Sequence, residues 1–132
     1  SYNSALMIRA NTLFFQITHE KRYLIEAQRI ARAAVAHWVR ADTGAIADDA
    51  SFAHLLTESF LFLFGQDHDP HHLAVVQRAL QFLHDTCRDS NDNYSGHWNE
   101  PRKPQDTVAL LAEASAARAN LMAALYLKPV SP

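Results

Sequence analysis

Two acidic residues, Asp48 and Asp49, stand side by side in the polar segment 41–50, ADTGAIADDA. Paired carboxylates can divide acid and base chemistry between them when their surroundings separate their pKa values. The structural alternative is that Asp49 or Ser51 caps a following helix and that Asp48 interacts favourably with the dipole of that helix. We favour the capping interpretation for this pair, and keep both side chains as candidate ligand-binding groups.

A second group with chemical potential lies in segment 89–105, DSNDNYSGHWNEPRKPQ, and consists of Tyr94, His97, Trp98 and Glu100. An exposed aromatic ring beside polar groups suits a sugar, because the ring covers the apolar face of the sugar while the polar groups bind its hydroxyls. The alternative is that Trp98 packs inward and anchors the loop. The residues alone leave both interpretations open.

Metal binding has weaker support in this sequence. Oxygen-bearing side chains recur at Asp89, Asn91, Asn93, Ser95 and Glu100. The sixth position of a calcium loop requires Gly but holds Tyr94, and Pro101 would stop the exit helix. A second set with metal-capable side chains is His68, Asp69, His71 and His72. We interpret this set as the polar start of a helix and Cys87 as a small buried hydrophobe, and we expect no metal and no cofactor.

The composition is that of one globular domain. The chain has 132 residues, 48% hydrophobic and 20% charged, with a net charge of −2. It lacks the excess of basic residues that nucleic-acid binding normally requires. The densest apolar run, residues 60–64, is far shorter than the ~20 residues of a membrane span. We therefore expect neither a nucleic-acid nor a membrane partner.

Apolar residues recur at helical spacing in five segments, and none alternates as a strand would. The predicted helices span residues 4–18, 20–40, 51–65, 70–88 and 106–127. We expect Asn3 or Ser4 to cap the first helix and an Asp-Thr pair to cap the fifth. The first, third and fifth segments carry less charge than the other two. The sequence therefore predicts an all-α protein with three inner and two outer helices.

The helices also repeat at an interval of 49 residues, which places His19 over His68 and Leu24 over Leu73. Stacked helical hairpins of this size are typical of solenoids and closed toroids. In such a stack, segments 41–50 and 89–105 lie on the same side. The sequence opens, without Met, inside an apolar helix pattern, and we expect a processed chain or a piece of a larger ring.

The opening Tyr2-Asn3 is followed by the segments EKRYLIEAQRIARAAV, GAIADDASF, RDSNDNYSGHW and AEASAARANLMAAL. In the order of these five features the chain resembles glycoside hydrolase family 76. The resemblance covers essentially the whole chain but only the second half of that family's domain. It implies two-layer helical hairpins that form part of an (α/α)6 toroid with endo-α-1,6-mannanase-like activity, and a secreted or periplasmic location.

The resemblance places Tyr2, Asn3, Asp48 and Phe52 at the cleft and makes Trp98 a loop residue beside it. Several positions depart from the family pattern: Ser4-Ala5, Ala53-His54, His97 and Glu113. The catalytic Asp pair of the family lies in the N-terminal half, so we expect no catalytic residue in this chain. The predicted substrate-binding set is Tyr2, Asn3, Asp48, Asp49, Phe52, His97, Trp98 and Glu100.

The expected function is that of the C-terminal portion of a family 76-like glycosidase acting on α-mannosidic polysaccharide, inactive by itself. The expected partners are a mannan-like glycan and either a second copy of the chain or the missing N-terminal half. Two alternatives remain open. One is a non-catalytic helical-repeat scaffold, and the other is a different (α/α) toroid sugar enzyme, such as an epimerase or an unsaturated-uronyl hydrolase.

Overall fold

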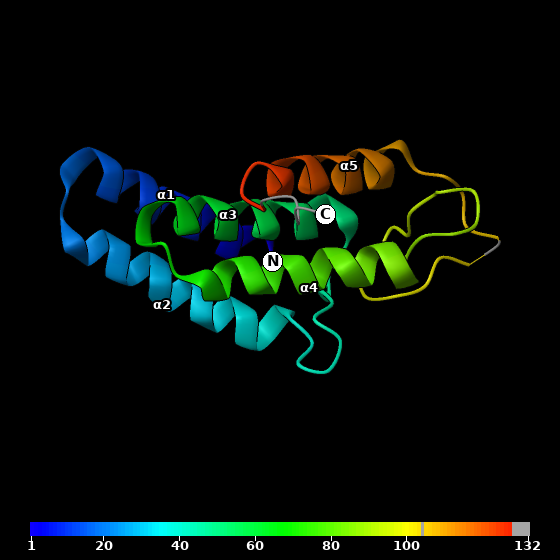
Figure 1. The fold of residues 1–132 in the computed structure, drawn as a ribbon, viewed down its shortest axis with the longest axis horizontal. Helices are drawn as coiled ribbons and strands as arrows, with labels where there is room; N and C mark the ends of the chain where they lie inside the picture. The colour runs from blue at the N-terminus through cyan, green and yellow to red at the C-terminus, as the bar shows by residue number, and fades with distance from the viewer. Residues whose placement is uncertain (104, 128–132) are drawn as a thin grey trace, which may run out of the picture.

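The computed structural model describes residues 1–103 and 105–127 and contains five helices in that part of the chain (Figure 1). They are α1 (Tyr2–Thr18), α2 (Lys21–Trp38), α3 (Ala50–Asp67), α4 (Pro70–Thr86) and α5 (Leu110–Ala124). The only strand-like pairings among the described residues are isolated bridges, which confirms the all-α prediction. None of the described helices is both long enough and apolar enough to cross a bilayer.

The helices form two layers. In the inner layer, α3 lies between α1 and α5, and in the outer layer α2 and α4 cover one side of these three (Figure 1). Only α3 packs against all four other helices. The prediction that the first, third and fifth helices form one layer and the second and fourth the other is therefore confirmed.

The amino-acid pattern explains the layers. In α2 the buried face is a narrow stripe of Ala27, Ala31 and Ala34, whose small side chains let the helix approach its neighbours closely. In α3, by contrast, half of the residues are buried, including Leu56 and Phe60 at 0% exposure. A helix that is apolar on most sides must be covered on most sides, which places α3 at the centre.

The 49-residue repeat is visible in the turns between the helices. His19 after α1 and His68 after α3 both adopt the left-handed conformation, with φ of 58° and 55°. Two residues later, α2 begins at Lys21 and α4 begins at Pro70. The two hairpins are therefore built with the same turn.

The start of the fifth helix differs from the prediction. It lies at Leu110 rather than at residue 106, and Ala109 precedes it without a side-chain cap. Asp106 instead accepts a hydrogen bond from the backbone N–H of Lys103 within the loop (2.9 Å). The predicted Asp-Thr cap is wrong, because the Asp side chain closes a turn of the loop before the helix begins.

The start of the first helix also differs. It begins at Tyr2 with Ser1 at the cap position and no side-chain capping bond. The predicted caps Asn3 and Ser4 lie inside the first turn, so that prediction is wrong.

One buried carboxylate connects the three inner helices. Glu58 of α3 is only 4% exposed, and the guanidinium of Arg118 from α5 grips both of its oxygens, with 2.9 Å between Nη2 and Oε2. Arg9 of α1 approaches the same carboxylate at 4.0 Å. The hydrogen bonds that Arg118 donates to Glu58 raise the pKa of Arg118, so its guanidinium stays charged.

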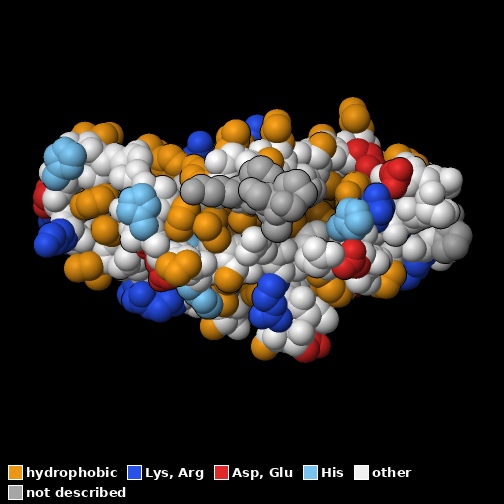
Figure 2. Space-filling model, viewed as in Figure 1, with side chains coloured by type: hydrophobic (Ala, Val, Ile, Leu, Met, Phe, Trp, Pro, Cys, Tyr) orange, Lys and Arg blue, Asp and Glu red, His pale blue; other side chains and the backbone are white. Residues whose placement is uncertain are grey.

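The outer flanks of α1 and α5 are apolar and uncovered within the described part of the chain. On α1 the exposed apolar residues are Leu6, Met7, Leu13, Phe14 and Ile17. On α5 they are Leu110, Leu111, Leu121 and Leu125. Figure 2 shows hydrophobic side chains along the edge formed by α5. These two helices resemble α3 in composition but have an inner-layer neighbour on one side only.

We predict that residues 1–132 associate in solution through these flanks. Covering several hundred Å² of apolar surface at about 25 cal/mol per Å² is worth on the order of 10 kcal/mol. Sedimentation velocity should show species larger than a monomer, and the double substitution Leu13→Glu with Leu121→Glu should shift the population to monomer. Ile25→Glu, at an exposed apolar position on α2, is the control and should have no effect. A wild-type monomer at every concentration would contradict the prediction.

We also predict that Arg118→Met destabilises the fold more than Glu58→Gln does. Loss of Arg118 leaves the buried Glu58 carboxylate without its main partner, and stranding a buried charge costs about 3 kcal/mol. Loss of the Glu58 charge leaves two arginines that are half exposed and can be hydrated. Thermal melts of the two variants test the order, and equal or reversed melting temperatures would refute it.

Candidate functional site

Four of the predicted site residues line one hollow of about 320 Å³ at the N-terminal ends of α1 and α3. They are Tyr2, Asn3, Asp48 and Phe52, joined by Ser1, Ser4 and Trp38. We call this hollow the Tyr2–Phe52 pocket. The sequence analysis did not single out Trp38, because its spacing fits the buried stripe of α2 and the pattern does not show that the helix ends there.

Topology brings these residues together. Because α1 and α3 are successive inner helices of a repeating hairpin, they run in the same direction and begin at the same end of the molecule. The rings of Tyr2 and Phe52 lie 5.8 Å apart between centroids, inclined at 55°. They are 45% and 42% exposed, so both rings present apolar surface to the pocket.

The link between α2 and α3 carries Asp48 into the pocket. Gly44 adopts a φ of 82°, and a Cβ there would lie 2.7 Å from Cβ of Arg78 on α4. A residue other than glycine would therefore clash with α4 as well as strain the turn. Arg78 holds the link by donating to the carbonyl of Ala41 at 3.0 Å.

Asp48 is an ionised acceptor at the edge of the pocket, with 17% of its side chain exposed. Partial burial acts to raise the pKa of Asp48, but hydrogen bonds from the amino group of Ser1 and the backbone N–H of Asp49 outweigh it, so the pKa is lowered. A lowered pKa suits a carboxylate that accepts hydrogen bonds and does not suit a proton donor.

Asp49 is the N-cap residue of α3. Its Oδ1 accepts a hydrogen bond from the backbone N–H of Ser51 at 2.8 Å, as an N-cap does. The capping interpretation is confirmed. We therefore assign Asp49 to helix capping rather than to substrate binding.

Trp98 lies next to Asp48 in the backbone but not in the pocket. Its backbone N–H donates to the carbonyl of Asp48 at 3.1 Å, and the backbone N–H of Ala50 donates to the carbonyl of Gly96 at 2.8 Å. The indole ring, however, is 1% exposed. The prediction of an exposed stacking ring is wrong, because the loop turns the largest side chain of this segment into the core, where it anchors the loop.

His97 and Glu100 are exposed and line a different hollow, of about 500 Å³, together with Tyr94 and Arg102. His97 pairs with Asp49 through an isolated backbone bridge, so the two hollows share the same end of the molecule. The structure thus divides the predicted residues between two hollows, and His97 and Glu100 do not line the Tyr2–Phe52 pocket.

The long loop before α5 is organised by Asp89. Its Oδ1 accepts from the backbone N–H groups of Asn91 and Asn93 at 2.8 and 2.9 Å, and its Oδ2 accepts from Nε of Arg102 at 2.8 Å. The backbone bond from Asn93 and the bond from Arg102 hold the pKa of Asp89 far below its usual range. These oxygens fold the loop, and in the described ranges no three His, Cys, Asp or Glu side chains converge as metal ligands would.

The histidine-rich turn after α3 has a structural role at the other end of the helices. Asp67 and His72 are buried and paired at 3.1 Å, and Gln28 of α2 donates to the same carboxylate at 3.0 Å. His68 and His71 are exposed. Cys87 is buried, which confirms the prediction of a small buried residue, and burial raises its pKa to about 11.

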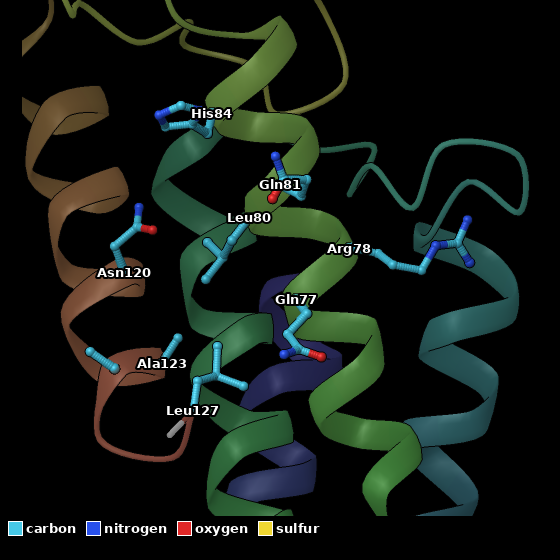
Figure 3. A pocket seen from close by; sticks show the side chains of 9 residues that line it. Gln77, Arg78, Leu80, Gln81, His84, Asn120, Ala123 and Leu127 are labelled. Atoms are coloured by element: carbon cyan, nitrogen blue, oxygen red, sulfur yellow. The ribbon is translucent and has the colours of Figure 1, made fainter. Parts of the chain in front are cut away.

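A larger hollow of about 1010 Å³ lies between α4 and α5, and Figure 3 shows Leu80, Gln81 and His84 of α4 facing Asn120 and Ala123 of α5. It contains none of the predicted site residues. In the repeat, α2 packs on α1 and reaches α3, and α4 packs on α3 and reaches α5. The hollow lies where a further outer helix would pack by the same rule, so we interpret it as a helix-packing groove.

Comparison with known proteins supports the fold. The chain superposes on a GH76 α-mannanase of Bacteroides thetaiotaomicron with a TM-score of 0.85 and 29% identity, over 96% of this chain and 35% of that one. It superposes on the Lin0763 protein of Listeria innocua with a TM-score of 0.80 and 23% identity, over 95% of this chain and 37% of that one. No family model and no curated protein matches the sequence.

These similarities concern a part of a larger fold, since the chain spans little more than a third of each solved structure. The five helices have the arrangement of a segment of a GH76-like (α/α)6 toroid.

Proposed function

We propose that this chain forms one wall of a sugar-binding cleft in a family 76-like glycosidase domain that acts on α-mannosidic polysaccharide. One observation carries the proposal: two half-exposed aromatic rings, Tyr2 and Phe52, lie beside an ionised carboxylate in an open pocket. The structural likeness to a GH76 α-mannanase supports it.

The pocket offers the groups that a sugar needs. The inclined rings of Tyr2 and Phe52 can cover the apolar face of a pyranose, and Asp48 can accept hydrogen bonds from its hydroxyls. Asn3, which is exposed on the first turn of α1, can both donate and accept. These four residues are the binding set that we propose, and Trp38 supplies part of the pocket wall.

We assign no catalytic residue to the chain. Glycoside hydrolysis generally requires two carboxyl groups in different environments, one of them protonated at working pH. Asp49 caps α3 through its side chain, so the adjacent pair does not provide an acid and a base. In the proposed function, catalysis belongs to the remainder of a complete toroid. That remainder, or a second copy of this chain, would also cover the apolar flanks of α1 and α5.

We predict that α-1,6-linked mannotriose binds to the chain. Phe52→Ala should weaken this binding about fivefold, because it removes one aromatic contact worth about 1 kcal/mol. NMR titration measures the affinity. Phe14→Ala is the matched control, because Phe14 is an equally exposed aromatic residue that stacks on Tyr23 at 5.2 Å, away from the pocket. Equal weakening by both variants, or no binding at all, would favour the helical-repeat scaffold instead.

We predict in addition that the isolated chain does not hydrolyse α-1,6-mannan. Reducing-sugar release over a long incubation should equal the blank, since no acid and base pair is present in the pocket. Turnover that Asp48→Asn or Asp49→Asn abolishes would overturn this assignment and make the chain an enzyme in its own right.

A further inference from the structure

A second cluster of side chains on α1 and α3 lies outside the Tyr2–Phe52 pocket and centres on Arg9 and Phe62. Phe52 and Phe62 lie ten residues apart on α3, about 15 Å at the rise of an α-helix. Across the α1–α3 seam, Tyr2 lies against Phe52, and the guanidinium of Arg9 lies over the ring of Phe62 at 5.4 Å from its centroid.

Arg9 is held in place but retains most of its hydrogen-bonding capacity. Its guanidinium carbon lies 5.4 Å from the centroid of the Phe62 ring, and its one ion-pair contact among the described residues, to Glu58, is long at 4.0 Å. About half of its side chain is exposed (49%). The Glu58 carboxylate already accepts hydrogen bonds at both of its oxygens from the guanidinium of Arg118. The charge of Arg9 is therefore left without an acidic partner of its own.

The charges around this cluster sum to a positive value. Two arginines share one glutamate, and α1 contains no Asp or Glu. The remaining acidic side chains of the inner helices have other hydrogen-bonding partners. Asp67 pairs with His72 at the far turn, and Glu113 accepts the backbone N–H of Tyr94 at 2.8 Å. A guanidinium that is oriented, half exposed and uncompensated is a good partner for an oxyanion.

We propose that Arg9, supported by Phe62 and by the Arg118–Glu58 pair, forms an oxyanion subsite. Its distance from the Tyr2–Phe52 pocket is about the length of a short oligosaccharide. The ligand group is a phosphate ester or a carboxylate carried by the sugar chain. The sugar part of this inference rests on the proposed function, whereas the oxyanion part does not. The substrate class that follows is an acidic or phosphorylated glycan in place of a plain neutral mannan.

The test compares three probes by NMR titration at low salt: methyl α-mannoside, mannose 6-phosphate and glucuronate. We expect at least one anionic probe to bind about tenfold more tightly than the neutral one, the gain of one charge-assisted hydrogen bond. Preference for mannose 6-phosphate alone identifies a phosphate ligand, and preference for glucuronate alone identifies a carboxylate. High salt should remove the preference, because half-exposed charges are screened.

Two variants locate the effect. Arg9→Gln should abolish the anion preference and leave the melting temperature nearly unchanged, since its ion-pair contact is long. Arg22→Gln is the matched control, because Arg22 also lies over an aromatic ring, Tyr23 at 4.8 Å, and pairs with Glu20 at 2.9 Å, but on α2 of the outer layer. It should keep the preference.

An anion preference that survives Arg9→Gln, or no preference in the wild-type chain, would overturn the subsite. Anion binding that depends on Arg9 without any binding of methyl α-mannoside or mannotriose would sustain the subsite and refute the sugar-binding proposal. The two proposals therefore fail independently.

Discussion

The architecture depends on the burial of α3. This helix is apolar on most of its circumference, so water must be excluded from nearly all of it, and four other helices pack around it to do so. The outer helices cover one side, α2 with a narrow stripe of Ala and α4 with a broader face of Ala, Val and Leu, and α1 and α5 cover the two flanks. The buried carboxylate in the middle of α3, Glu58, is tolerated because Arg118 donates hydrogen bonds to both of its oxygens.

The same constraint creates the candidate site. When successive inner helices flank one another in the same direction, their first turns meet at one end, and side chains that are 50 residues apart in the sequence become neighbours. Tyr2 and Phe52 remain half exposed because none of the five described helices covers their outer sides. The link between α2 and α3 brings Asp48 beside them, and the long loop before α5 lines the other hollow. Gly44 lets the first link pass against Arg78, and Asp89 folds the second.

The long loop before α5 shows how a residue that looks functional can be structural. A tryptophan with His97 and Glu100 close in the sequence suits a sugar-binding loop, yet the indole of Trp98 is buried and its backbone pairs with the start of α3. A loop of this length orders its backbone at a considerable entropic cost, and burial of the largest side chain offsets part of it. The open aromatic surface lies instead on α1 and α3, which are rigid elements, and this makes the positions of Tyr2, Phe52 and Phe62 well defined.

The sequence by itself determined the helical class, the positions of the five helices to within a few residues, the two layers and the 49-residue repeat, because these follow from local periodicity. It also identified Tyr2, Asn3, Asp48 and Phe52, though through a family resemblance and not through any pattern of their own. The sequence also favoured Asp49 as a helix cap, and the structure confirms it. Only the tertiary structure decided that Trp98 faces inward and that His97 and Glu100 line a separate hollow. It alone joined Arg9, Glu58 and Arg118, which come from three helices. The direction of a side chain in a loop depends on which surfaces remain uncovered once the helices have packed. The same packing decides which residues of different helices meet. Local periodicity in the sequence encodes neither of these outcomes.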